Sequence, residues 1–144
     1  MTDTFRDRAP IPERCVIVVD DELAAGQAAN AAAVIALTVG QRHPGLVGAP
    51  LIDASNHEHP GLIPIGIAVL AAGQDDLVEI RHKGIIANCD IVDFPIQGQQ
   101  TKDYAAFRDA VAQVETRDLR YAGIALVGDS KPIRKTVAKC RLFK

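Results

Sequence analysis

One run of residues, Cys15 to Val19 (CVIVV), constrains the fold of this chain more than any other. It consists of β-forming residues without polar alternation, which is typical of a strand covered on both faces. Strands and helices then alternate along the chain. Further strands are predicted at 66–72, 89–96 and 119–128, and helices at 23–41, 74–88, 101–114 and 131–139. This alternation predicts an α/β fold: a three-layer α/β/α sandwich around a four-stranded sheet that is mixed but mostly parallel.

The length of 144 residues suits one domain with a hydrophobic core. We therefore expect a single domain over 1–144, in which the polar residues 1–13 form a loose N-terminal arm. Residues 42–64 are rich in Gly, Pro and His and are predicted to be mostly loop. Because aromatic residues make up only 4% of the chain, the core is expected to consist of Ala, Val, Ile and Leu.

Several classes of protein are excluded by the composition. The apolar stretches are too short to span a bilayer, and the polar N-terminus lacks the apolar middle of a signal peptide. The three cysteines are unclustered and odd in number, which favours buried, reduced thiols in a cytoplasmic protein. Because no CxxC or HxxxH spacing is present, we expect no metal site, and no cofactor is predicted.

The charges are unevenly distributed along the chain. All 18 acidic residues lie at or before Asp129, whereas the last 14 residues carry six of the 16 Lys and Arg residues and no acid. Such a basic end suits an anionic partner, or it forms the solvated face of a terminal helix, whose C-terminus favours cations. Both interpretations stay open at this point.

The junction between the first strand and the first helix carries three acids, Asp20, Asp21 and Glu22. A phosphate site at such a junction uses backbone N–H groups, usually with several glycines and a lysine. Here Gly26 stands alone and no lysine is near, so phosphate binding is not expected. The acids are predicted either to cap the helix or, through Asp20, to help bind a cation, an amine or a sugar hydroxyl.

The first helix is almost pure alanine, so another element can approach it closely. That element could be the sheet, a second helix across a dimer interface or a ligand. Asn30 lies among the alanines, where helix propensity gives it no advantage. Its amide both donates and accepts hydrogen bonds, so we expect Asn30 either to tie down a neighbouring loop or to contact a ligand.

Two further groups supply candidates for chemistry. One loop combines Asp53 with His57 and His59, and a histidine beside a carboxylate can act as a base. A solvated loop without chemistry is the alternative. Asp93 lies near the carboxyl end of the third strand, where open α/β sheets place their sites. Asp90 is expected on the opposite face of that strand, so the two acids do not form a carboxylate pair.

Both ends of the chain carry motifs of a known family. The opening segment is CVIVVDDELAAGQAANAAAVIAL, the closing one is GIALVGDSKPIRKTVAKCRLF, and IVDFP lies between them. They resemble the first strand and alanine-rich helix, the closing strand and short helix, and the Ile-x-Asp-Ala-Gly segment of the archaeal and eukaryotic type of peptidyl-tRNA hydrolase. The chain resembles still more closely a family of small, uncharacterised bacterial proteins that share this fold, with an Asn-x-Ala-Ala helix and an HPG segment before the second strand.

The resemblance implies the fold of that hydrolase but not its activity. Gln27 and Ala29 stand where the hydrolase family carries two turn lysines, and Ala36 stands where it carries a helix histidine. Asp93 keeps a family position, whereas Gln97 replaces a threonine that follows it. Loss of the basic groups is expected to lower the rate by several orders of magnitude. Neither tRNA binding nor hydrolysis is therefore expected.

Two functional hypotheses follow, and they leave open whether the protein is an enzyme. In the first, a non-hydrolase binds a small polar ligand or a protein partner at the carboxyl ends of the strands. Its candidate ligand-binding residues are Asp20, Asn30, Asp53 and Asp93. In the second, a diverged esterase or tRNA-acting hydrolase has His57, His59 and Asp93 as catalytic candidates, with one of the histidines as the base. A homodimer that packs its alanine face against its twin is a third possibility.

Overall fold

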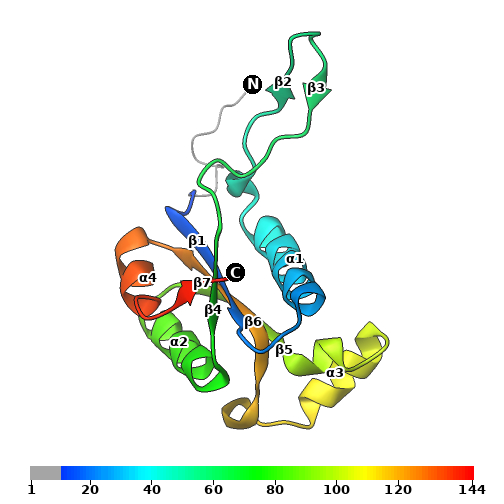
Figure 1. Cartoon of the computed structure of the whole chain (residues 1–144), viewed down its shortest axis with the longest axis vertical. Coiled ribbons are helices and arrows are strands. Elements are labelled where there is room, and N and C mark those ends of the chain that lie inside the picture. The colour runs from blue at the N-terminus through cyan, green and yellow to red at the C-terminus, as the bar shows by residue number, and fades with distance from the viewer. Residues whose placement is uncertain (1–10) are drawn as a thin grey trace, which may run out of the picture.

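Strand β1 (Arg14–Asp20) lies in the middle of the sheet and is covered on both faces, as its unbroken apolar run predicts. A computed structural model describes residues 11–144 of the chain (Figure 1), so most of the predicted N-terminal arm lies outside the described residues. Five strands form the main sheet in the order β5-β6-β1-β4-β7. The other four are β4 (Ala68–Ala72), β5 (Asp90–Pro95), β6 (Tyr121–Gly128) and β7 (Arg141–Leu142).

The prediction of a four-stranded, mostly parallel sheet is wrong in two respects. The chain tail adds a fifth strand, β7, which pairs with β4. Only β1 and β4 are parallel neighbours, because β6 runs antiparallel to both β1 and β5. The cause is α3 (Tyr104–Ala112), which stays near the end of the sheet where β5 finishes and does not cross back over it (Figure 1). Strands β1, β4 and β5 still share one direction, so their carboxyl ends meet at the same end of the sheet.

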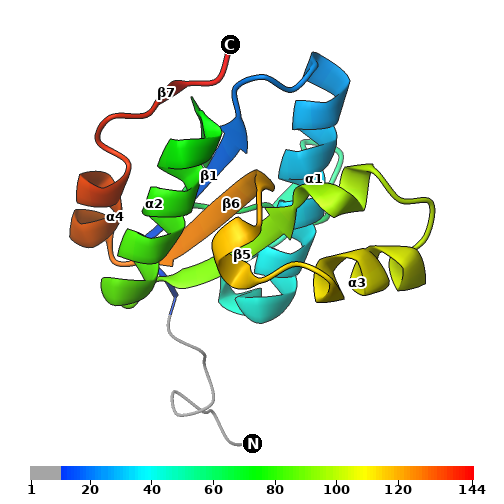
Figure 2. The ribbon, with the colours of Figure 1, turned by 90° about the horizontal axis from the view of Figure 1, so that it is seen from below.

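The three layers are as predicted. Helix α1 (Ala25–Arg42) covers one face of the sheet, and α2 (Gln74–Ile86) and α4 (Ser130–Thr136) cover the other, as Figure 2 shows. The buried residues of α1 are Ala28, Ala31, Ile35 and Val39, which follow the helical period. The hydrophobic core is accordingly split into two clusters, one on each face of the sheet. Among residues 11–144, no helix is both long and apolar enough to span a membrane.

The helix caps differ from those predicted. The Asp20 Oδ1 atom accepts a hydrogen bond from the Glu22 backbone N–H within the turn, and neither Asp20 nor Asp21 caps α1. Helix α3, predicted to begin at Thr101, begins at Tyr104. Asp103 caps it instead by accepting from the Ala106 backbone N–H at 2.8 Å. The Thr101 hydroxyl donates to a carbonyl of the preceding turn.

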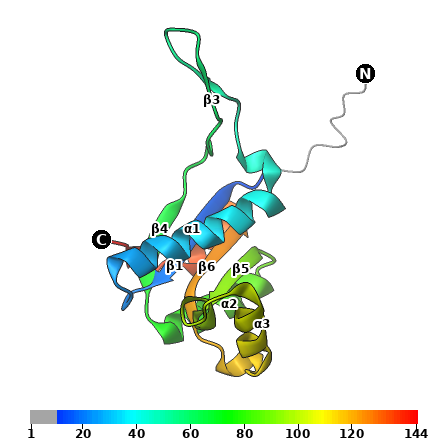
Figure 3. The same cartoon turned by 90° about the vertical axis from the view of Figure 1, so that its right-hand side faces the viewer.

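The predicted loop at 42–64 contains more structure than expected. After the short 3₁₀ turn η1 (Pro44–Leu46), strands β2 (Leu51–Ile52) and β3 (Glu58–His59) form a small antiparallel hairpin. We call residues 47–66 the arm, because they project away from the sheet (Figures 1 and 3). Glycine is required at Gly61, where a Cβ atom would lie 2.0 Å from the Gly48 carbonyl oxygen. The two strands of the arm are too short for a periodic pattern to predict them.

Candidate functional site

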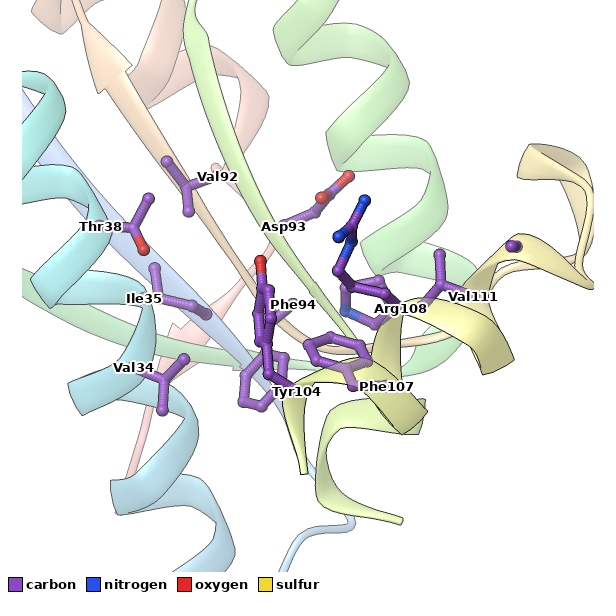
Figure 4. Close-up of a pocket in the computed structure, with 12 residues that line it drawn as sticks. Val34, Ile35, Thr38, Val92, Asp93, Phe94, Tyr104, Phe107, Arg108 and Val111 are labelled. Atoms are coloured by element: carbon purple, nitrogen blue, oxygen red, sulfur yellow. The ribbon is translucent and has the colours of Figure 1, made fainter. Parts of the chain in front are cut away.

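An apolar groove of about 500 Å³ opens between α1, the edge strand β5 and α3 (Figure 4). It exists because α3 stands off from the sheet: no residue of α3 is fully buried. The contact of the Phe107 ring with the Phe94 ring of β5 holds the helix in place. The Phe107 ring lies 5.9 Å from the Phe94 ring of β5 and 6.1 Å from the Tyr104 ring, measured between centroids. Val34, Ile35 and Val92 complete the apolar walls.

The two charged side chains of the groove, Asp93 and Arg108, lie at one end of it (Figure 4). Asp93 lies on its wall and is held by Arg81 of α2, whose Nε atom donates to Asp93 Oδ2 at 2.6 Å. Arg81 also lies over the Tyr121 ring, 5.8 Å from its centroid. Arg108 extends from α3 toward the same end (Figure 4) and makes no ion pair with any of residues 11–144. Within residues 11–144, Arg108 is therefore a cation without an ion-pair partner, and it lies beside an acid, Asp93, that is already paired with Arg81.

The groove lining contains little that could catalyse a reaction. It includes no Cys, His, Ser or Lys side chain, and its two hydroxyl groups belong to Thr38 and Tyr104. The only carboxylate of the lining, Asp93, is engaged by Arg81. Such a lining suits binding of an apolar group better than acid–base or nucleophilic chemistry.

Asn30 lies in a second hollow, of about 300 Å³, next to the groove. The two hollows share Val34, Phe94, Tyr104 and Phe107. Asn30 is exposed, and its Oδ1 atom accepts a hydrogen bond of 3.3 Å from Gln99, which also donates to the Gln27 carbonyl. Asn30 thus ties the turn η2 (Ile96–Gln99) to α1, the loop contact that its position suggested. Its contact with a ligand stays a prediction.

Asp20 belongs to a different network at the carboxyl end of β1. Its Oδ2 atom accepts from the Gln74 side-chain amide at 3.0 Å. The same amide donates to the Tyr121 carbonyl at 2.7 Å, and the Gln74 Oε1 atom accepts from the Tyr121 N–H at 3.0 Å. The sequence gives no sign of this role, because its pattern identifies Gln74 only as the first residue of a predicted helix.

The predicted histidine site lies on the arm. The His59 Nε2 atom is 2.9 Å from Asp53 Oδ2, and the His57 ring packs edge-on against the His59 ring. The hydrogen bond from His59, with a smaller contribution from the His57 backbone N–H, lowers the pKa of Asp53. The arm rises on the opposite side of the molecule from the β1–α1 turn (Figures 1 and 3). Asp53, His57 and His59 therefore line neither the groove nor the hollow beside Asn30.

Asp90 clamps the end of α1 onto β5. Arg42 donates to both of its carboxylate oxygens, at 2.9 and 2.8 Å, and His43 Nε2 lies 2.7 Å from Asp90 Oδ2. The hydrogen bond from Arg42 is the main reason why the pKa of Asp90 lies below its ordinary value. Since Asp90 binds residues of α1 and Asp93 binds a residue of α2, the two acids do lie on opposite faces, as predicted.

Replacing Asp90 by Asn is expected to make protein stability less dependent on pH. The folded state lowers the pKa of Asp90, so the carboxylate stabilises the protein above its unfolded pKa of about 4 and loses this effect as the pH falls through the lowered folded value. In urea unfolding at pH 7, Asp90→Asn should cost about 1–3 kcal/mol, and the difference should shrink toward pH 3. Asp109→Asn, an exposed control on α3, should change little at either pH. A pH-independent loss in Asp90→Asn would contradict this explanation.

The basic chain end lies against acids of its own chain. The Arg141 guanidinium is 2.9 Å from Asp21 Oδ2. On α2, the pKa of Glu79 is lowered by its hydrogen bond with Lys83 and, to a smaller extent, by the charge of Lys139. The uneven charge distribution along the sequence is thus partly compensated in the fold.

The cysteines and the metal-binding side chains of residues 11–144 form no further catalytic or metal site. All three cysteines are free, and burial raises the pKa of the Cys15 thiol to about 11, so it is a poor nucleophile. Within residues 11–144, no group of three or more His, Cys, Asp or Glu side chains is arranged to hold a metal ion.

Comparison with known proteins agrees with this fold. The sequence profile of a family described as "Protein of unknown function (DUF2000)" matches residues 13–144. A solved structure of a protein of unknown function from Agrobacterium tumefaciens strain C58 is similar, with a TM-score of 0.83 and 21% sequence identity over 91% of this chain and 97% of that one. At this identity the likeness concerns the fold alone. No curated protein sequence matches the chain.

Proposed function

The chain belongs to the DUF2000 family, whose function is unknown, and from the geometry of its groove we propose that it is a binding protein. The ligand is an apolar molecule with a negatively charged end. Its apolar body enters the groove between α1, β5 and α3, and its charged end lies beside Arg108. The observation that carries this proposal is an apolar groove with one cation that has no ion-pair partner among the described residues.

The dimensions and chemistry of the groove support this class of ligand. A volume of about 500 Å³ lies within the range of sites that bury drug-sized molecules. Phe94, Tyr104 and Phe107 offer ring faces and edges to an acyl chain or an aromatic ring. A guanidinium binds carboxylates and phosphates through two parallel hydrogen bonds. The ligand we propose is thus more apolar than the small polar ligand expected from the sequence.

The likeness of the fold to peptidyl-tRNA hydrolases is part of the proposal, supported by the motifs at both chain ends. Hydrolase activity is not part of the proposal. Positions 29 and 36, where that family carries a lysine and a histidine, are alanines in this chain, so neither supplies a basic group. The acids ahead of α1, and the ion pair of Arg141 at the basic end with Asp21, argue against tRNA as a partner. A cytoplasmic location belongs to the same proposal, supported by the three free cysteines.

One observation favours a second candidate function, a diverged esterase. The His59–Asp53 pair, at 2.9 Å, is an arrangement that can orient a histidine as a general base. Both side chains are largely exposed on the arm and line none of the hollows described above. Hydrolysis of peptidyl-tRNA or of simple aryl esters that is lost in His59→Ala would establish this function. If the wild type and His59→Ala both turn over these substrates at the background rate, this function is excluded.

The binding proposal is tested with two fluorescent probes of similar shape. Anilinonaphthalene sulfonate is apolar and anionic, and N-phenylnaphthylamine is its neutral counterpart. We expect Arg108→Ala to weaken binding of the anionic probe roughly tenfold and to leave the neutral probe unchanged, because only the former loses a charge-assisted contact. Ala112→Trp should weaken binding of both probes, because the indole fills the groove lined by Ala112.

Arg117→Ala provides the matched control, since Arg117 is an exposed arginine beyond the end of α3 that does not line the groove. It should bind both probes like the wild type. Circular dichroism checks that each variant is folded. If Ala112→Trp binds the anionic probe as well as the wild type does, the groove is not the binding site and the proposal is wrong.

A further inference from the structure

The outer face of α1 carries no charge. Residues 25–41 include no Asp, Glu, Lys, Arg or His, although most of the residues between the four buried positions are exposed or half-exposed. Leu37 is 79% exposed, and Ala29 and Ala33 lie on the same exposed face. A surface helix of a monomeric protein usually has charged or polar residues opposite its buried stripe. The exposed residues of α1 include the polar side chains Gln27, Asn30, Thr38 and Gln41 but no charged one before Arg42, which suits a covered surface.

Two glycines on the same helix point to a close neighbour. A Cβ atom at Gly26 or Gly40 would meet no heavy atom of the chain within 4 Å, so packing within the chain does not require glycine there. Glycine in a helix costs up to about 1 kcal/mol relative to alanine. A backbone that approaches α1 from outside the chain would explain both positions.

The arm presents a second unpartnered apolar surface beside this face. Leu62 is 66% exposed and Ile52 is 59% exposed, and Val47 and Leu51 are also exposed. An isolated two-stranded hairpin is marginally stable in water unless it packs against another element. Figure 3 looks onto α1 and shows the arm rising just beyond its C-terminal end, so one partner can cover both the helix face and the arm.

We propose that this surface is the interface of a homodimer, in which α1 packs against α1 of a second copy across a two-fold axis and each arm lies along the partner. A side chain that lies on the two-fold axis faces its own copy, so a charge there would meet a like charge. A helix face without any charge avoids this repulsion, and its small side chains allow the two backbones to approach. The large aliphatic side chains of the arm then lose their exposure to water.

Charge distinguishes a second copy from other occupants. Membrane surfaces and nucleic acids attract Lys and Arg, but residues 25–41 and the arm contain neither. The charged residues of the arm are the acids Asp53 and Glu58. Arg108 and Lys102, which form no ion pair within residues 11–144, lie on the side of α1 that holds the groove. In the dimer these two cations can pair with the acids of the partner's arm, which is a favourable arrangement. The dimer does not rest on the proposed ligand, although Val34 borders both surfaces.

The first test measures the oligomeric state by light scattering during size-exclusion chromatography at about 50 µM protein, where interfaces of standard size are occupied. The wild type is expected to be a dimer and Leu37→Arg a monomer, because the substitution buries two unpaired charges at the interface. Ile86→Arg is the matched control: Ile86 is 71% exposed but lies on α2, across the sheet. It should remain a dimer.

The second test locates the interface. Ala33→Cys should give a covalent dimer with a short bifunctional thiol reagent, because Ala33 lies in the middle of the uncharged face. Ala105→Cys, exposed on α3 in a chain with the same three native cysteines, should not. A monomeric wild type, or a dimer that Leu37→Arg leaves intact, would overturn the proposal. If monomeric Leu37→Arg still binds both fluorescent probes, the groove binds its ligand independently of the dimer.

Discussion

Gln74→Ala is expected to lower the free energy of unfolding by about 2–4 kcal/mol, a large effect for a single polar residue. The pairing of β1 with β6 ends at Val19 and Gly123, and the pairing of β5 with β6 is interrupted by an irregularity beside Pro95. Tyr121, which is 1% exposed, pairs with Pro95 of β5 beyond this irregularity, and its main chain lies past the end of the β1–β6 pairing. Both of its polar groups are bound by the Gln74 side chain, at 2.7 and 3.0 Å.

The alanine variant leaves these two buried backbone groups and Asp20 without their partner. Such groups cost far more when unsatisfied than their hydrogen bonds contribute when formed. Gln74→Glu should be comparably destabilised at pH 7, because a carboxylate replaces the donor that faces the Tyr121 carbonyl and the Asp20 carboxylate. It should recover stability as the pH falls and the introduced group is protonated.

Urea unfolding at a single protein concentration measures these effects. Gln113→Ala is the matched control, since Gln113 is an exposed glutamine at the end of α3. It should change the free energy of unfolding by less than about 0.5 kcal/mol. A Gln74→Ala variant as stable as this control would show that water replaces the amide without loss.

Ile35→Ala is expected to cost about 2–4 kcal/mol, because Ile35 is 1% exposed and packs between α1 and the sheet. The helix approaches the sheet closely here. A Cβ atom at Gly123 would lie 3.0 Å from the Ile35 Cδ1 atom and 3.0 Å from the Val18 carbonyl oxygen. Gly123→Ala should therefore destabilise the protein by about 1–3 kcal/mol through overpacking.

The two substitutions should partly compensate each other. Once Ile35 is alanine, the methyl group at position 123 enters the space that the Cδ1 atom has left, and only the contact with Val18 remains. The double variant should therefore lose at least about 1 kcal/mol less than the sum of the single variants. Ile86→Ala, the same substitution at an exposed position, should stay within about 0.5 kcal/mol of the wild type. Strict additivity would contradict the proposed contact.

The candidate site shows how far sequence patterns reach. The position of Asp93 near the end of its strand was predictable, and it does lie on the wall of the groove. Arg108 was not predictable as a groove residue, because a single cation on an amphipathic helix has no distinguishing pattern. The candidate residues Asp53, His57 and His59 lie apart from the groove, since the loop that carries them folds outward as the arm.

Local patterns by themselves determined the layers of this protein. An unbroken apolar run of five residues requires cover on both sides, and the period of buried residues along α1 and α2 identifies the faces that provide it. Strand direction, the fifth strand, the groove and the arm were decided only by the tertiary structure. Each depends on where a connection ends in space: α3 stays at one end of the sheet, and the two-residue strands β2, β3 and β7 form only because a partner lies beside them. Sequence periodicity records which face of an element is buried, but not which neighbour buries it.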